Sequence, residues 1–459
     1  MHKTGSFTEG GILSSLIRFA LPVLLALFLQ AMYGAVDLLV VGKFGEATDI
    51  SAVSTGSQIM HTVTVIITGL TMGVTVLIGQ KIGEKEYREA GRAVGSGICL
   101  FGAVALGLTV LMLALATPMS VLMHAPEEAL SKTALYVQIC SAGMIFIVAY
   151  NVLGGIFRGI GDSRMPLITV AIACALNIAG DLILVAVFHM GVAGAALATV
   201  SAQGVSVILS FLIIRKRQLP FAIKKKDVRF NGKCIRRILF LGIPIALQDL
   251  LVSISFLVIL AIVNSLGVIA SAGVGVAEKL CAFIMLVSSA YMQSMSAFVA
   301  QNIGASREDR ARKALLYGVI SSVGVGLLMA YLSFFHGDGM ALIFASDGEV
   351  ISAAAEYLKA YAIDCMLTAF LFCFVGYFNG CGKTFFVMVQ GIAGAFCVRI
   401  PVSYIMSHAA GGSLFYIGLA TPASTVVQIL LCIGYFFYLA RSRKKALLKK
   451  EEDKPAYVP

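Results

Sequence analysis

Charged residues are scarce in this sequence, and their scarcity excludes an ordinary soluble protein. Only 13% of the 459 residues are Asp, Glu, Lys or Arg, whereas 59% are hydrophobic. Soluble domains carry roughly 25% charged residues, so the surplus apolar surface here needs lipid to cover it. Tryptophan is absent, which leaves Tyr, Lys and Arg to mark the membrane interfaces.

Cysteine motifs and enzyme signatures are also missing. The ten cysteines include no C-x-x-C pair, and most of them fall within apolar segments. We interpret them as small core residues rather than as a disulfide or metal framework. No H-E-x-x-H or G-x-S-x-G pattern occurs. We therefore expect no enzyme, no cofactor and no metal centre.

Long apolar segments recur along the whole chain and predict an all-α polytopic membrane protein. A helix needs roughly 20 apolar residues to cross the bilayer, and most segments here exceed that length. The first one is far longer than the roughly 7–15-residue core of a signal peptide, so we expect it to be retained as a span. We place twelve spans near residues 14–41, 50–79, 92–117, 131–157, 165–189, 191–214, 237–263, 268–301, 313–335, 352–379, 384–407 and 413–439.

The basic residues fix the predicted orientation. Of the 35 Lys and Arg residues, 30 lie in alternate connections or in the two termini. The opposite connections at 188–191, 264–270 and 408–413 contain none. By the positive-inside rule, both termini are cytoplasmic and the number of spans is even. The net charge of +11 is then explained by basic residues that lie beside the anionic inner leaflet of the cell membrane. We expect no nucleic acid as partner.

An internal repeat links the two halves of the chain. IGQKIGEKEYREAGRA (78–93) matches VAQNIGASREDRARKA (299–314) at a shift of 221, with five identities. GGIFRGIGDS (154–163) matches VGYFNGCGKT (375–384) at the same shift. Because an even number of spans separates the copies, the repeat is parallel, as in many transporters.

The repeat predicts two six-helix bundles within one chain, which we expect to be monomeric. The N-lobe, with spans 1–6, covers residues 1–214 and is followed by a basic cytoplasmic linker at 215–236. The C-lobe, with spans 7–12, covers residues 237–440 and is followed by a cytoplasmic tail at 441–459.

Acidic groups inside spans are costly in lipid and are functional candidates by default. Span direction and a rise of 1.5 Å per residue put Asp37 about 30 Å and Asp181 roughly 25 Å from the inner side. Asn177 shares the helix face of Asp181. Tyr136 and Thr199 lie in the first turns of inward-running spans, so all five groups reach a similar depth in the outer half of the N-lobe.

The C-lobe has its own ionisable groups. Asp364 and Arg399 lie at similar depth on adjacent spans, and a lone charge there would cost more than a pair. We therefore favour a buried ion pair over direct contact with a substrate. Glu278 and Asp249 are further candidates for a C-lobe cavity.

Several motifs together resemble the multidrug and toxic compound extrusion (MATE) family over about residues 12–440. They are the P-x7-Q-x6-D pattern ending at Asp37 with VVGKFG after it, the QKIG and QNIG signatures, and FRGIGDSRMP after span four. The resemblance implies an antiporter that exports organic, often cationic, compounds in exchange for H⁺ or Na⁺. It also implies that Asp37, Asn177, Asp181, Tyr136 and Thr199 form an N-lobe cation site.

The acids are not duplicated with the rest of the repeat. Asn177 and Asp181 correspond to Val398 and Val402, and Asp37 falls in an apolar run. An acid that only supported the fold would more often survive in both copies, so a functional role is favoured.

The coupling ion is predicted to be the proton. Sodium-coupled relatives carry an acid on span seven two turns after its proline, where Val252 stands here and Asp249 comes one turn early. Na⁺ at Asp37, Asn177 and Asp181 stays open.

Two other functions stay open. A flippase for lipid-linked saccharides shares the superfamily architecture. A cavity rich in Arg and Lys would favour that function. A membrane-embedded enzyme or receptor would need a catalytic cluster or a large soluble domain, and the sequence shows neither.

The predicted orientation can be tested with reporter fusions. A reporter after Lys445 or within 215–233 should read cytoplasmic, because the basic connections stay inside. A reporter at Gly337 should read external. A cytoplasmic signal at Gly337 would overturn the span count.

Overall fold

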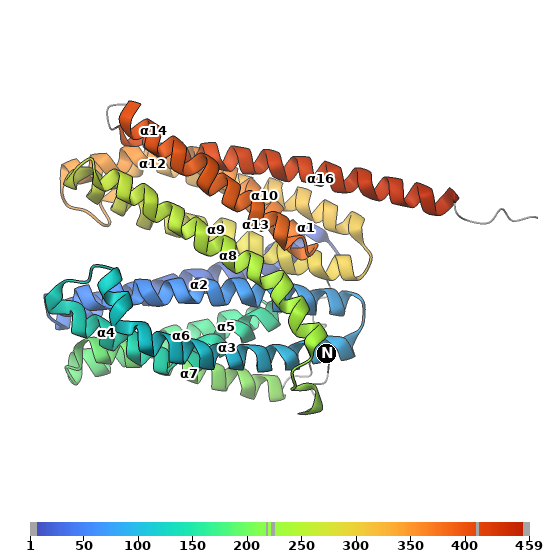
Figure 1. Cartoon of the computed structure of the whole chain (residues 1–459), viewed down its shortest axis with the longest axis horizontal. Helices are drawn as coiled ribbons and strands as arrows, with labels where there is room; N and C mark the ends of the chain where they lie inside the picture. Colours follow the sequence, from blue (N-terminus) through green and yellow to red (C-terminus); the bar gives the residue numbers. More distant parts are fainter. Residues whose placement is uncertain (1–6, 217–218, 222–224, 410–412, 453–459) are drawn as a thin grey trace, which may run out of the picture. The chain divides into compact units, whose positions relative to one another are not determined.

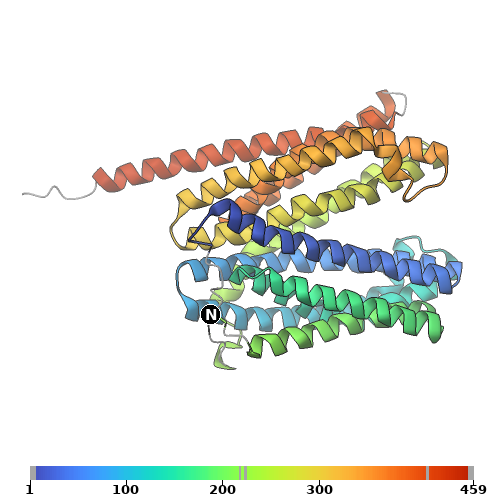
Figure 2. The same cartoon turned by 180° about the vertical axis from the view of Figure 1, so that it is seen from behind.

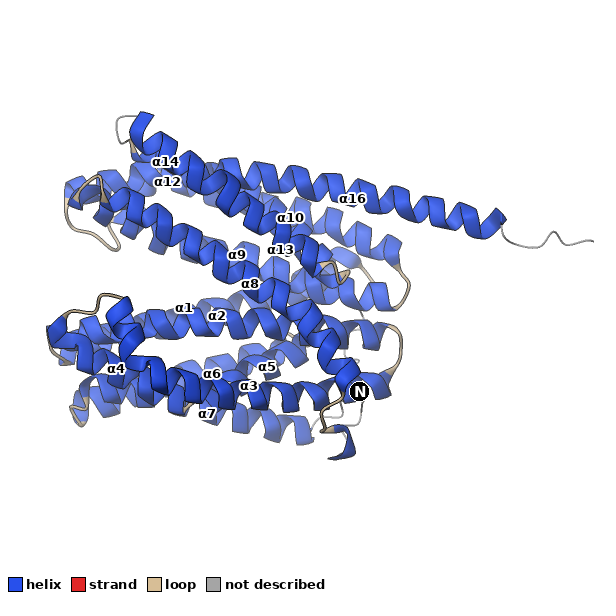
Figure 3. Cartoon of the chain, viewed as in Figure 1, coloured by secondary structure: helices blue, strands red, loops and turns tan. Residues whose placement is uncertain are grey.

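The computed structural model describes residues 7–216, 219–221, 225–409 and 413–452. Helices make up almost all of this part of the chain, and no strand occurs in it (Figure 3). The first half contains α1 (Ile12–Phe44), α2 (Ala47–Gly83), α3 (Tyr87–Leu122), α4 (Glu127–Ala142), α5 (Met144–Ile160), α6 (Arg164–Asp181), the π-helix η1 (Leu182–Val187) and α7 (Gly191–Lys216). After the short 3₁₀-helix η2 (Lys225–Asp227) come α8 (Gly232–Asn264), α9 (Val268–Gly304), α10 (Glu308–Phe335), α11 (Gly337–Ala341), α12 (Gly348–Gly380), α13 (Thr384–Ile392), the π-helix η3 (Ala393–Arg399), α14 (Ile400–Ala409), α15 (Leu414–Gly418) and α16 (Ala420–Glu452).

The predicted twelve-span architecture is confirmed. Eleven helical segments of the described chain are long and apolar enough to cross a membrane, and α4 with α5 supplies the twelfth as a bent pair. The sequence predicted one continuous span there, but the helices meet at 56°. The break lies at Gly143, where an added Cβ would come within 2.3 Å of Val200 Cγ1. Glycine at this position therefore lets α7 approach the bend.

Contacts divide the chain into two compact units. The first contains residues 1–253, 282–322 and 376–388, and the second contains residues 254–281, 323–375 and 389–459. The first unit thus holds α1–α7 together with part of each of α8, α9, α10, α12 and α13. Figures 1 and 2 show α2–α7, coloured blue to green, side by side in this unit. These two units are defined by packing and divide several helices, so they do not test the lobe boundaries at 214 and 237, which stay a prediction.

Small residues let two helices of the first unit approach closely. A Cβ added at Gly69 of α2 would lie 2.6 Å from the Cα of Ala246, and one at Gly73 would lie 2.4 Å from the carbonyl oxygen of Ile238. On the facing helix α8, a Cβ at Gly242 would lie 2.6 Å from the carbonyl oxygen of Leu70. Membrane helices associate through such small-residue contacts because lipid supplies no hydrophobic force between them.

Candidate functional site

Four of the five polar residues predicted for the N-lobe site meet in the first unit. Thr199 Oγ1 donates to Asp37 Oδ2 at 3.1 Å, and Asn177 Nδ2 donates to Thr199 Oγ1 at 3.4 Å. The carboxyl groups of Asp37 and Asp181 are within hydrogen-bonding reach of each other. Asp37, Asn177 and Asp181 are 4%, 1% and 0% exposed, so the cluster is almost completely buried.

Local sequence explains why these side chains meet. A Cβ added at Gly180 would lie only 3.0 Å from the Cβ of Ala198, so a small residue on each helix brings α6 and α7 together. The next residues along the chain are Asp181 and Thr199, and Thr199 accepts a hydrogen bond from Asn177 of α6 across this contact. The π-helix η1 begins directly after Asp181. Such π-segments occur mostly at functional sites, where they alter the direction of side chains.

Tyr136 lies beside the cluster rather than in its hydrogen-bond network. Its ring packs on α2 at Gly56, where an added Cβ would lie 2.6 Å from Tyr136 Cδ1. Its side chain is 3% exposed and is close enough to both carboxyl groups for an electrostatic interaction. Tyr136 therefore forms part of the wall of the site.

The cluster offers acceptors without matching donors. Asp37 Oδ1, Asn177 Oδ1 and both carboxyl oxygens of Asp181 are buried and have no hydrogen-bond partner in the described structure. Buried polar atoms are nearly always satisfied, and two carboxylates within hydrogen-bonding reach of each other cannot easily both stay ionised without a cation between them. The arrangement fits a proton shared by the pair. Its oxygen atoms also suit Na⁺.

Two polar residues next to the cluster were missed by the sequence analysis. Gln203 Nε2 donates to the hydroxyl of Tyr33 at 3.3 Å, and Tyr33 lies one turn before Asp37 on α1. Gln30, Tyr33 and Asp37 have the i, i+3, i+7 spacing of one helix face. That spacing was visible in the sequence and could have identified Tyr33.

A cavity of about 50 Å³ is lined by residues of α1, α5, α6 and α9. Arg158 lines it, and the buried Nε of this residue has no hydrogen-bond partner among the described residues. No acidic side chain contributes to the lining. Its polar lining residues are Gln30, Tyr150, Asn151, Arg158, Thr169 and Gln293.

The predicted pairing of Asp364 with Arg399 stays a prediction. No Asp364–Arg399 salt bridge within 4.0 Å occurs in the described part of the second unit, although both side chains are buried there. Arg399 instead donates to Ser255 Oγ at 3.2 Å, and its guanidinium lies 4.3 Å from the ring centroid of Phe256. Asp364 accepts from Thr368 Oγ1 at 2.6 Å. The two charges are nevertheless close enough for an electrostatic interaction with each other.

The remaining C-lobe candidates are not joined to this group by any described contact. Glu278 is partly buried, and its Oε1 has no hydrogen-bond partner in the described structure. Asp249 lies in the first unit and Glu278 in the second. Their predicted place in a C-lobe cavity stays a prediction.

Known proteins match this chain along most of its length. The MatE family model matches twice, at residues 22–183 and 244–405, which reproduces the repeat. "Probable multidrug resistance protein YpnP" of Bacillus subtilis (strain 168) is 27% identical over 406 residues, covering 88% of this chain and 91% of that protein. "Multidrug export protein MepA" of Staphylococcus aureus (strain bovine RF122 / ET3-1) is 24% identical and covers 95% of this chain and 96% of its own.

A solved structure confirms the fold. It is described as "Outward-facing conformation of a multidrug resistance MATE family transporter of the MOP superfamily". It matches with a TM-score of 0.89 at 20% identity, and the alignment covers 97% of this chain and 99% of that one. With both halves of the chain matched by the family model, the protein belongs to the MATE family.

Proposed function

We propose that this protein exports organic cations in exchange for protons, and that Asp37 and Asp181 bind both in turn. The observation that carries the proposal is the contact between two buried carboxyl groups with unpartnered oxygens. The names of the curated relatives, which are multidrug resistance and export proteins, support drugs as the cargo. The protein would thus be a transporter and not an enzyme.

The exchange follows from charge balance. With the pair ionised, the pocket is negative and attracts an organic cation. When a proton enters, the pocket loses charge, and a buried cation without a counter-charge is strongly disfavoured. Proton and cation therefore compete for one site. Alternating access of the two six-helix bundles would expose this site first to one side of the membrane and then to the other.

Sodium and lipid-linked saccharides are the alternatives. The oxygen cluster suits Na⁺ as well as a proton, and only transport under separate gradients distinguishes them. A saccharide flippase would need several basic groups to hold a phosphate-linked lipid. The described cavity is lined by a single basic residue, Arg158. Export of cations is therefore the better supported function.

The first test concerns the titrating acid. Asp37→Asn keeps the size of the side chain but cannot change charge, so proton-driven efflux should fall at least tenfold while the protein still folds. The measurement is ethidium efflux from cells, with membrane levels quantified. Asp338→Asn, at an exposed position on α11, is the matched control and should transport normally. Wild-type efflux by Asp37→Asn under a proton gradient alone would make Asp37 structural.

The second test compares the two halves. Asp364→Asn should reduce transport less than Asp181→Asn at equal expression, because Asp364 accepts from a hydroxyl and lies near a cationic side chain, whereas Asp181 lies near a second acid and no described residue donates to it. Equal losses, or a larger loss at Asp364, would place the coupling site in the C-lobe.

The third test identifies the coupling ion. In proteoliposomes, an imposed pH gradient should drive substrate uptake or release without Na⁺, and Asp181→Asn should abolish this response. An imposed Na⁺ gradient at equal pH on both sides should have no effect. Transport that follows only the Na⁺ gradient would contradict proton coupling.

A further inference from the structure

The two copies of the Q-x-I-G motif lie against each other in the first unit. Gln80, near the end of α2, donates through Nε2 to the carbonyl oxygen of Gly380 at 3.2 Å. Gln301, near the end of α9, donates through Nε2 to the carbonyl oxygen of Gly159 at 3.0 Å. The repeat shift of 221 relates Gln80 to Gln301 and Gly159 to Gly380, so each donor and each acceptor has its counterpart in the other bond. The two hydrogen bonds are therefore related by the pseudo-two-fold symmetry of the chain.

The glycines of the two motif copies also make reciprocal contacts. A Cβ added at Gly83 would lie 2.0 Å from the carbonyl oxygen of Gln301, and one at Gly304 would lie 2.0 Å from that of Gln80. Real Cβ atoms never approach so closely, so the backbones of α2 and α9 touch at both positions. A Cβ at Gly79 would also lie 3.0 Å from the Cβ of Ala300.

A segment from each half crosses to the other half at this end. Residues 7–10, before α1, bind α10: Arg310 donates to the carbonyl oxygens of Phe7, Glu9 and Gly10, each at 2.8 Å. The ring of Phe7 lies 5.1 Å from that of Phe298. The N-terminal segment of the first half is thus held by helices of the second.

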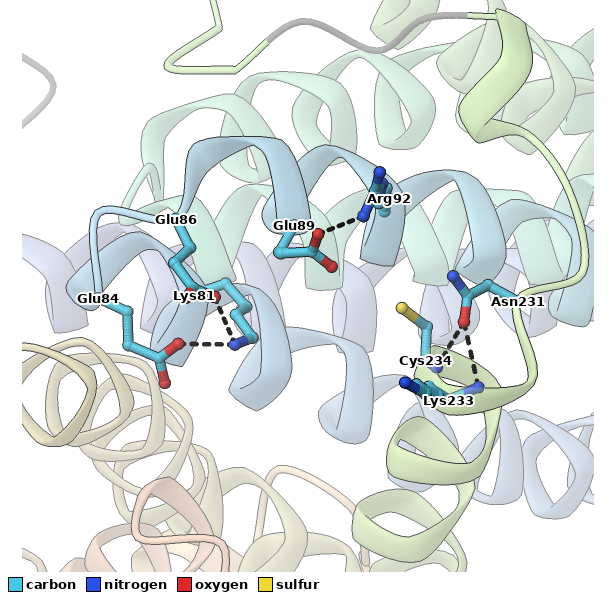
Figure 4. Close-up of polar contacts among 8 residues, drawn as sticks. All are labelled: Lys81, Glu84, Glu86, Glu89, Arg92, Asn231, Lys233 and Cys234. Carbon is cyan, nitrogen blue, oxygen red and sulfur yellow. Dashed lines mark hydrogen bonds and ion pairs between the residues drawn. The ribbon is translucent and has the colours of Figure 1, made fainter.

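The linker before α8 makes the corresponding contact with the first half. A Cβ added at Gly95 of α3 would lie 2.2 Å from the carbonyl oxygen of Asp227. Asn231 Oδ1 then accepts from the backbone nitrogens of Lys233 and Cys234, which starts α8 beside α3 (Figure 4). Lys81 pairs with Glu84 and Glu86 at 2.6 and 2.7 Å and holds the turn between α2 and α3.

From these reciprocal contacts we propose that Gln80, Gly83, Gln301 and Gly304 form an inner gate, closed here, that separates in every transport cycle. The proposal rests on alternating access as the proposed function. The gate lies at the end of the helices that the basic residues predict to be cytoplasmic.

The chemistry of the gate bonds suits repeated opening. The acceptors, Gly159 and Gly380, lie in the last turns of α5 and α12, where carbonyl oxygens have no partner within the helix. When the helix ends separate into water, solvent can replace each glutamine amide. Opening therefore leaves no buried polar group unsatisfied.

The gate can be tested by cysteine accessibility, without any drug. A reporter Ala300→Cys is placed in a chain whose ten natural cysteines are replaced, since Ala300 is fully buried against Gly79. A membrane-impermeant maleimide is applied to inside-out and to right-side-out vesicles. Gly83→Ala and Gly304→Ala should each raise labelling from the cytoplasmic side about tenfold, because the added methyl group prevents closure.

Matched controls separate gate opening from general effects of alanine. Gly102→Ala in α3 and Gly324→Ala in α10 add the same methyl group where nothing lies within 4 Å, so labelling should stay at the reporter's own level. Gln80→Ala and Gln301→Ala, which lose only a hydrogen bond, should raise labelling less than the glycine variants. Gln58→Ala, exposed on α2, should not change it.

The outcomes decide the gate independently of the coupling ion. Unchanged labelling in the glycine and glutamine variants, at normal membrane levels, would overturn the gate. If the glycine variants fail to fold, the glutamine variants decide alone: increased labelling supports the gate and unchanged labelling overturns it. Raised labelling together with normal efflux by Asp37→Asn would support the gate and contradict the coupling site.

Discussion

The proximity of the carboxyl groups of Asp37 and Asp181 is the constraint on which the polar cluster of the first unit depends. Two acids in a bundle interior repel each other and have lost their water, so the pair needs a proton or another cation in every state. The neighbouring hydroxyl of Thr199 and the amide of Asn177 can orient the pair but cannot neutralise it. A site of this kind changes charge with what it binds, which supports the proposed exchange of a proton for a cation.

Close helix packing makes this site possible. Gly180 and Ala198 bring α6 and α7 together, Asn177 of α6 donates to Thr199 of α7, and a π-helix begins directly after Asp181. In lipid, such contacts rely on shape and hydrogen bonds, because apolar side chains gain nothing by leaving one apolar solvent for another. The same kind of contact recurs between α2 and α8 at Gly69 and Gly242.

The sequence predicted the architecture well because hydropathy, basic residues and the repeat are strong signals. It also predicted which N-lobe residues would meet, since equal depth along the spans left few other partners for Asp37. It missed the bend at Gly143, because a glycine inside an apolar run is compatible with a straight helix. It placed Asp364 and Arg399 at similar depth but did not identify the hydrogen-bond and aromatic partners of either side chain. Hydropathy gives depth but not the direction of a side chain, and Thr368, Ser255 and Phe256 supply partners that no spacing rule identifies.

The internal repeat has different consequences at the proposed gate and at the acid pair. At the proposed gate each copy of the motif supplies one donor and one acceptor, so losing either copy would leave half of the contact unmade. Selection on that contact acts on both copies at once, and Q-x-I-G is present in each. An ion site needs only one copy, and a second buried acid pair would add another charge to neutralise in every state. The valines that stand where the repeat would place Asn177 and Asp181 are consistent with that cost. The roles proposed for the gate and for the acid pair therefore account for a scaffold that is duplicated and an acid pair that is not.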